Sequence, residues 1–144
     1  PCKTRRQRQM CIRDSHHCRG KASVTLLGEG TEAANHWERG VLNSPHNVYA
    51  RHISLAVDGV PRLIARSLTT PDHAVVELMQ GLGERPLAEL LFTDPLWVRD
   101  KHAVYLQTPS GLPGRGVLWC HQDHQQQLLV EEFFLPALLQ SAAK

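Results

Sequence analysis

Two arginines and two adjacent glutamates are the residues in this sequence best suited to bind a small anionic molecule. Arg51 and Arg66 lie in two apolar and β-branched segments that are joined by an Asp-Gly pair at 58–59, and an apolar run at 128–135 contains two acids at 131–132. A guanidinium group can bind a carboxylate through two parallel hydrogen bonds. A carboxylate within an apolar strand needs a hydrogen-bond partner. An anionic ligand and internal ion pairs both satisfy these requirements, and the pattern alone leaves the choice open.

The Asp-Gly pair predicts a β-hairpin over 47–69, because both residues tolerate the positive φ angles of a two-residue type I′ turn. With that loop Val57 faces Val60, and Arg51 then faces Arg66 on the more apolar face. Like charges directly opposite destabilise a strand pair, and an unpaired buried charge is costly. We therefore expect either a ligand with two carboxylates or internal acids beside these arginines.

The two glutamates of the last apolar run are expected on opposite faces of one strand, because side chains alternate along a strand. One of them can be solvated, and the other points inward. The inward carboxylate could accept a hydrogen bond from a substrate hydroxyl group or could pair with Arg51 or Arg66. The alternation does not say whether Glu131 or Glu132 is the inward residue.

The remaining pattern predicts a single α+β domain in which an antiparallel sheet has helices packed on one side, since no regular βαβ alternation is present. We expect residues 31–46 to be irregular and 108–116 to form a Gly/Pro loop. The other expected elements are strands over 22–29, 96–106, 117–121 and 127–135, and helices over 72–80 and 87–92.

Basic residues are concentrated at the N-terminus of the 144-residue chain. Residues 1–15 contain five basic residues and one acidic residue, whereas the rest contains 11 basic and 13 acidic residues. The segment 5–15 resembles a translated sequencing adapter, so we interpret 1–15 as a non-native tail and 16–144 as the domain. The domain is then slightly acidic and has few aromatic residues, which disfavours a nucleic-acid-binding function.

No other pattern in the sequence indicates a cofactor or a membrane segment. No apolar run reaches the roughly 18 residues that cross a bilayer. Outside the tail only Cys18 and Cys120 remain, which is typical of a reducing cytoplasm and not of a disulfide framework. His121 and His124 lie in an expected turn without further ligands, so we expect no metal and no other cofactor.

Seven short segments, taken in order and spacing, resemble the chorismate–pyruvate lyases of ubiquinone biosynthesis between residues 22 and 138. Each segment alone is weakly specific, and the combination is considerably more so. The segments are Ser23-Val24-Thr25, Tyr49-Ala50-Arg51, Ala65-Arg66, 82–87 (LGERPL), Leu91-Phe92-Thr93, Arg99-Asp100 and 132–137 (EFFLPA).

The resemblance implies an antiparallel sheet with flanking helices, a closed internal pocket, and cleavage of chorismate into 4-hydroxybenzoate and pyruvate without a cofactor. Arg51 matches the arginine that binds the ring carboxylate, and Arg66 matches a second pocket arginine suited to the pyruvyl carboxylate. Glu132 matches the glutamate at the hydroxyl end of the product, and Leu87 matches a position whose backbone contacts the ligand. Glu132 and Arg66 are the expected catalytic residues.

The chain departs from this family's pattern upstream of residue 22. The family begins with helices and a ligand-contacting segment, where this chain has the adapter-like tail. We therefore expect an N-terminally truncated, monomeric domain whose pocket lacks one wall. The alternative function is a non-catalytic module of the same fold that binds a small acid as effector. In transcription regulators such modules follow a winged-helix domain, which this sequence does not encode.

Overall fold

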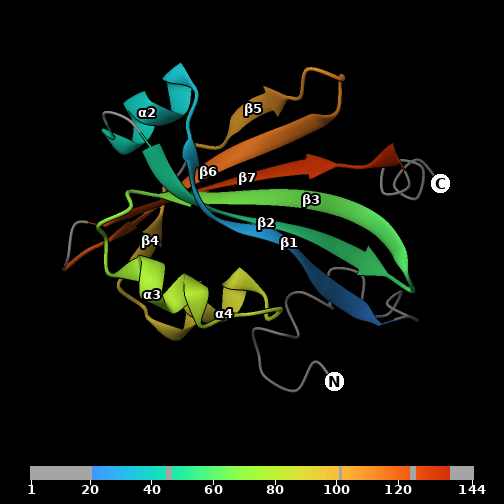
Figure 1. Cartoon of the computed structure of the whole chain (residues 1–144), viewed down its shortest axis with the longest axis horizontal. Coiled ribbons are helices and arrows are strands. Elements are labelled where there is room, and N and C mark those ends of the chain that lie inside the picture. Colours follow the sequence, from blue (N-terminus) through green and yellow to red (C-terminus); the bar gives the residue numbers. More distant parts are fainter. Residues whose placement is uncertain (1–20, 45–46, 101, 124–125, 137–144) are drawn as a thin grey trace.

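The protein forms a seven-stranded antiparallel sheet flanked by short helices (Figure 1). The computed structural model describes residues 21–44, 47–100, 102–123 and 126–136. The strand order is β1-β2-β3-β7-β6-β4, and β5 also pairs with β6. The strands are β1 (Ala22–Ala33), β2 (Asn47–Val57), β3 (Val60–Thr69), β4 (Trp97–Arg99), β5 (Val104–Gln107), β6 (Pro113–His121) and β7 (Gln127–Phe134). The helices are α2 (His36–Leu42), α3 (Val75–Gln80) and α4 (Leu87–Thr93). The predicted α+β class with one antiparallel sheet is confirmed.

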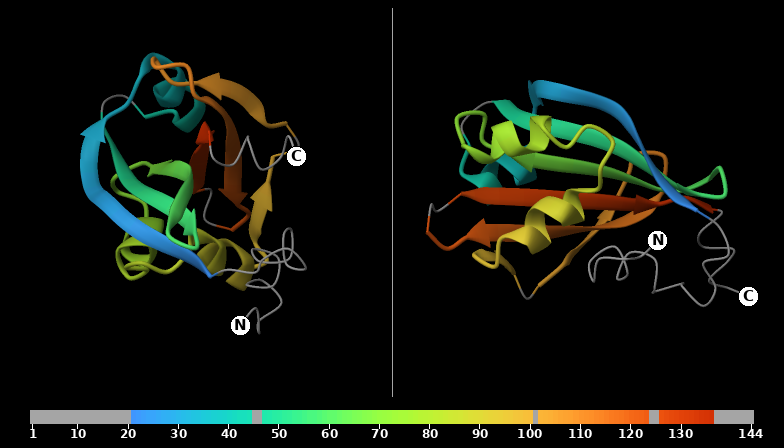
Figure 2. Two further views of the ribbon diagram at one scale, coloured as in Figure 1. Left: turned by 90° about the vertical axis from the view of Figure 1, so that its right-hand side faces the viewer. Right: turned by 90° about the horizontal axis from the view of Figure 1, so that it is seen from below.

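The two faces of the sheet are covered by different helices, so the expectation that all helices pack on one side is wrong. Figures 1 and 2 show α2 on one side and α3 with α4 on the other. We call these the α2 face and the α3–α4 face. Alternate residues of β2 and β7 belong to two separate apolar cores, as Val48 and Tyr49 illustrate by joining different clusters. The α3–α4 core comprises Tyr49, Val75, Met79, Leu82, Leu90, Leu91, Trp97 and Leu128, and the α2 core comprises Leu42, Val48, Ala50, Leu68 and Leu129.

The predicted hairpin between β2 and β3 is present with the predicted turn. Asp58 and Gly59 have φ angles of 54° and 79°, as a type I′ turn requires. The register shifts between Leu55 and Ala56, however, because a bulge inserts Arg62 into β3 between Pro61, which pairs with Ala56, and Leu63, which pairs with Leu55. Every pair beyond the bulge is therefore displaced by one residue from the predicted pairing.

The sequence-based expectation also missed α2, which lies in the segment 31–46 that was expected to be irregular. Asn35 caps the helix by accepting a hydrogen bond from the Glu38 backbone N–H at 2.8 Å. The Glu38 side chain accepts in return from the Asn35 backbone N–H at 2.9 Å, which completes a capping box. Asn43 ends the helix in the left-handed conformation, with a φ angle of 52°.

Other boundaries also differ from the predicted ones, and β1 extends to Ala33 instead of ending at 29. The single strand expected over 96–106 is divided into β4 and β5, which pair with different parts of β6. The side chain of Asp100 accepts a hydrogen bond from the His102 backbone N–H at 3.1 Å, a local turn that ends β4. Strand β6 begins at Pro113, inside the expected loop, and α3 begins at Val75, later than expected. None of the helices in the described part of the chain is long and apolar enough to cross a bilayer.

Candidate functional site

Arg51 lies at the centre of β2 on the α3–α4 face and is almost fully buried, with 1% of its surface exposed. Its Nη2 donates to the backbone carbonyl oxygens of Gly83 at 3.0 Å and Arg85 at 2.7 Å. Both carbonyls belong to the α3–α4 connection. The buried guanidinium therefore fixes the segment that leads into α4 and Leu87.

Among the residues that the structure describes, two buried polar atoms beside Arg51 have no hydrogen-bond partner: its own Nε and Oε2 of Glu29. Glu29 is the cross-strand neighbour of Arg51 on β1. Burial lowers the pKa of Arg51, and the nearby Glu29 carboxylate opposes that shift without making an ion-pair contact within the described residues. A desolvated cation with an unused donor is suited to an additional anionic partner.

Tyr49 belongs to the same polar group within the α3–α4 core. Burial raises the pKa of Tyr49 to about 12, and its hydrogen bond to Glu29 adds to the shift. Tyr49 therefore keeps its phenolic proton across the physiological range and donates a hydrogen bond to Glu29. That hydrogen bond accounts for one Glu29 oxygen and leaves Oε2 as the unpartnered atom.

Glu132 lies on the same α3–α4 face as Arg51, two strands away. Arg51 pairs with Ser67, and Glu132 pairs with Ala65 of the same strand. Strand spacing and rise put their Cα atoms about 12 Å apart, a span that two side chains and one small ring can fill. Glu132 accepts a hydrogen bond from Nε of Arg115 at 2.8 Å, and its side chain is 25% exposed.

Leu87 is the third predicted site residue on this face. It is the first residue of α4 and packs, partly buried, against the α3–α4 core. The structure thus brings Arg51, Glu132 and Leu87 to one side of the sheet.

Arg66 lies on the opposite, α2 face, so the prediction that it faces Arg51 is wrong. The bulge before Ala56 changes the register, and Arg51 pairs with Ser67 while His52 pairs with Arg66. Arg66 donates from Nε to Glu32 at 2.8 Å and forms an ion pair with Glu38. A direct substrate contact by Arg66 stays a prediction, and its guanidinium is already occupied by internal acids.

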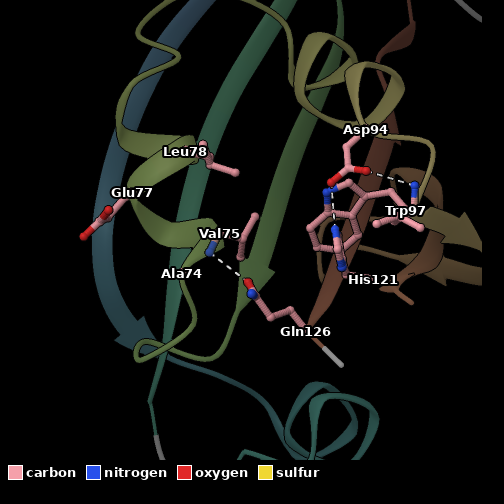
Figure 3. Close-up of a pocket in the computed structure, with 9 residues that line it drawn as sticks. Ala74, Val75, Glu77, Leu78, Asp94, Trp97, His121 and Gln126 are labelled. Atoms are coloured by element: carbon pink, nitrogen blue, oxygen red, sulfur yellow. Dashed lines mark hydrogen bonds and ion pairs between the residues drawn. The ribbon is translucent and has the colours of Figure 1, made fainter. Parts of the chain in front are cut away.

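A separate hollow of about 360 Å³ lies near the β6–β7 turn, beside the N-terminal end of α3 (Figure 3). There Nε2 of His121 and Oδ2 of Asp94 lie 2.7 Å apart, and Gln126 accepts a hydrogen bond from the Val75 backbone N–H at 2.8 Å. The lining residues are Ala74, Val75, Glu77, Leu78, Asp94, Leu96, Trp97, His121 and Gln126. This lining has two carboxylates and no lysine or arginine, so it disfavours a dianion and contains none of the predicted site residues.

Solved structures similar to this one are ligand-binding domains of bacterial transcription regulators, and they show the fold alone. The C-terminal domain of a histidine utilization repressor from Pseudomonas syringae matches with a TM-score of 0.60 at 14% identity, over 81% of this chain and 93% of that one. The effector domain of PhnF from Mycobacterium smegmatis matches with a TM-score of 0.56 at 13% identity, over 81% of this chain and 82% of that one. No protein-family model matches the chain.

Curated proteins similar in sequence carry one shared name, probable chorismate pyruvate-lyase. The protein from Shewanella sp. strain ANA-3 is 31% identical over 88% of this chain and 75% of its own length. The proteins from Dechloromonas aromatica and Bordetella pertussis are 34% and 35% identical over 65% and 62% of this chain. The chain spans 61% and 57% of the length of these two relatives. On the strength of the Shewanella match, the chain belongs to the chorismate pyruvate-lyase family.

Proposed function

We propose that this protein cleaves chorismate into 4-hydroxybenzoate and pyruvate at the α3–α4 face of its sheet. The observation that carries the proposal is the buried Arg51 guanidinium on the same face as Glu132, since its Nε has no hydrogen-bond partner in the described part of the chain. Membership of the chorismate pyruvate-lyase family supports chorismate as the substrate. Chorismate is a dianion, and a desolvated guanidinium group favours a carboxylate strongly.

The reaction needs only an elimination within one molecule. The bond between the ring carbon and the ether oxygen breaks, and the oxygen leaves with the electron pair as part of the enolpyruvyl group. The adjacent ring carbon, which carries the hydroxyl group, loses its proton. The ring becomes aromatic as 4-hydroxybenzoate, and the released enol takes up a proton at carbon to give pyruvate. Atoms balance without water, metal or redox partner, so the protein has to orient the dianion and exclude solvent.

Each residue of the proposed site then has one role. Arg51 binds the ring carboxylate, and its hydrogen bonds to the Gly83 and Arg85 carbonyls keep the segment before α4 closed over the ring. Leu87 at the start of α4 contacts the ring through its backbone. Glu132 lies at the oxygen end of the substrate, where it orients the hydroxyl group or the departing ether oxygen.

The test is to incubate the purified chain with chorismate and to measure 4-hydroxybenzoate by absorbance and pyruvate by a coupled assay. We expect equimolar products, and we expect Arg51→Lys to lower kcat/KM at least tenfold, because lysine keeps the charge but loses the planar fork. Arg99→Lys, at an exposed position, is the matched control and should leave turnover unchanged. Equal activity of the Arg51→Lys variant and the parent would contradict the role of Arg51.

The rival function is a small-acid effector module, which the similarity to regulator ligand-binding domains favours. It predicts tight binding of 4-hydroxybenzoate without chorismate turnover by a folded chain. Calorimetric titration with 4-hydroxybenzoate, run beside the turnover assay, separates the two functions. Binding with turnover supports the lyase, and binding without turnover supports the effector module.

A further inference from the structure

Five ionisable side chains from five different elements, Arg66 among them, meet on the α2 face. Its Nη1 lies 3.5 Å from Oε1 of Glu131, and its Nη2 donates to the Ala33 carbonyl oxygen at 3.1 Å. Glu32 lies between Arg66 and His52, at 2.8 Å from each. We call this group the Arg66 cluster, and its members are Glu32 (β1), Glu38 (α2), His52 (β2), Arg66 (β3) and Glu131 (β7).

The charges of the Arg66 cluster require a bound proton. Three carboxylates surround one permanent cation, and two of them, Glu38 and Glu131, are only 1% and 4% exposed. Two buried carboxylates beside one guanidinium cannot both stay ionised without a large cost. The β6 residue opposite Glu131 is Gly116, which offers no compensating charge. One of the two buried acids therefore holds a proton.

Glu131 is the acid that holds this proton. Burial, followed by the hydrogen bond and the negative charge of Glu38, raises the pKa of Glu131 to about 9. Burial alone would raise the pKa of Glu38 as well, but hydrogen bonds from Glu131, the Asn35 backbone and Arg66 lower it overall. Glu131 thus donates a hydrogen bond to an ionised Glu38, which in turn pairs with Arg66.

Two members of the Arg66 cluster are the chain neighbours of proposed site residues. His52 follows Arg51 on β2, and Glu131 precedes Glu132 on β7. Alternation puts the members of each neighbouring pair on opposite faces of the same strand. A shift of the β7 backbone at Glu131 consequently moves Glu132, because one peptide unit joins them.

We propose that Glu38, Arg66 and Glu131 are positioning residues, which hold β7 and α2 so that Glu132 is correctly placed on the other face while Glu131 keeps its proton. The statement about turnover rests on the proposed function, whereas the statement about the proton does not. When the proton leaves, Glu131 and Glu38 repel each other and separate α2 from β7.

The sign of the pH dependence follows from the direction of the Glu131 shift. Its pKa is higher in the folded chain than the ordinary 4.5, so the folded chain binds the proton more tightly than the unfolded chain. The contribution of Glu131 to stability is then greatest below 4.5 and is lost as pH rises toward about 9. Glu131→Gln keeps the shape and a donor toward Glu38 but cannot ionise.

The experiment compares the parent with Glu131→Gln, and with Glu77→Gln at an exposed position of α3 as the matched control. Urea unfolding is measured between pH 6 and pH 9.5, and the backbone amide signals of Arg51 and Glu132 are followed by NMR over the same range. For the parent and Glu77→Gln we expect stability to fall with rising pH and the Glu132 amide to titrate near pH 9. For Glu131→Gln we expect a flatter stability profile and no such titration.

In the turnover assay we expect Glu131→Gln to retain activity within about threefold at pH 6.5 and to extend its alkaline limit by at least one pH unit, about a tenfold change in proton concentration. An unchanged stability profile in Glu131→Gln would overturn the proton assignment. A flattened profile with an unaltered Glu132 titration would overturn the positioning role. If no variant converts chorismate, the proposed function fails, and the unfolding and NMR profiles still decide this inference.

Discussion

Arg51 and Arg66 lie within neighbouring strands, and they differ in how many hydrogen-bond and ion-pair partners surround their guanidinium groups. Arg66 on the α2 face contacts three carboxylates and a backbone carbonyl. Arg51 on the α3–α4 face donates to two backbone carbonyls, and within residues 21–44, 47–100, 102–123 and 126–136 neither its Nε nor Oε2 of the nearby Glu29 has a hydrogen-bond partner. Internal groups therefore satisfy the Arg66 guanidinium, whereas the buried polar atoms beside Arg51 are available to a ligand.

The difference teaches that burial of an arginine does not by itself identify a binding residue. Burial would lower the pKa of both guanidinium groups, but the hydrogen bonds that Arg66 donates to Glu38 and Glu32 raise its pKa overall. For Arg51 burial prevails, and its pKa is lowered. The unsatisfied cation is the one that gains most from an anionic ligand, since internal ion pairs already compensate the other.

The largest effect on stability is expected for Arg66→Met. Removing the guanidinium leaves Glu38 ionised in the core without its ion-pair partner, which costs about 3–5 kcal/mol of unfolding free energy. Urea unfolding at pH 7 measures the loss, and the exposed Arg99→Met is the control, with an expected change within about 0.5 kcal/mol. A loss of less than about 1 kcal/mol would mean that the internal acids do not depend on Arg66, and the contrast between the faces would disappear.

Arg51→Met should give a smaller loss of stability and a larger loss of binding. The Gly83 and Arg85 carbonyls lose a donor, but a desolvated charge is also removed, so we expect a net change of about 1 kcal/mol. Affinity for 4-hydroxybenzoate should fall about 10- to 100-fold, because one charge-assisted hydrogen bond contributes roughly 1.5–3 kcal/mol. Calorimetry and urea unfolding of the same sample measure both quantities. A destabilisation as large as that of Arg66→Met, with binding retained, would make Arg51 a structural residue.

The hairpin that carries both arginines was predictable, and its register was not. Asp58-Gly59 predicts the turn and the two strands correctly. Pro61 lacks a backbone N–H, and proline within sheets is found at edges, strand starts and bulges. Pro61 is therefore the sequence signal beside the bulge, which places Arg62 between the residues that pair with Ala56 and Leu55. The sequence does not show whether such a proline leaves the pairing of β3 with β2 regular or shifts its register by one residue. That shift decides which face of the sheet Arg66 occupies.

Helix α2 and its contacts with the sheet are also not predicted by the sequence pattern, for a related reason. Asn35 and Glu38 have the spacing of a capping box, and Asn43 suits the C-terminal end of a helix, so the signals for α2 were present. The helix has only seven residues, too few to give a clear apolar period. The pairing of Glu38 with Arg66 and Glu131 depends on tertiary packing between α2, β3 and β7, which local patterns do not encode. Assignment of Glu131 and Glu132 to opposite faces needed only strand alternation and is confirmed.

The smallest effect is expected for Asn35→Ala, which removes the side-chain cap of α2 and leaves the residues of the Arg66 cluster unchanged. The substitution removes the acceptor for the Glu38 backbone N–H but keeps the backbone N–H that donates to the Glu38 carboxylate. We expect a loss of about 1 kcal/mol in unfolding free energy and no change in 4-hydroxybenzoate affinity.

The double variant Asn35→Ala/Arg66→Met shows whether the cap and the Arg66 cluster act together. Both single variants act on Glu38, so we expect the double variant to depart from additivity by at least about 0.5 kcal/mol. Strict additivity would mean that α2 is held by its apolar contacts alone. The Arg66 cluster would then stabilise the sheet without holding the helix, and the proposed separation of α2 from β7 at alkaline pH would lose its physical cause.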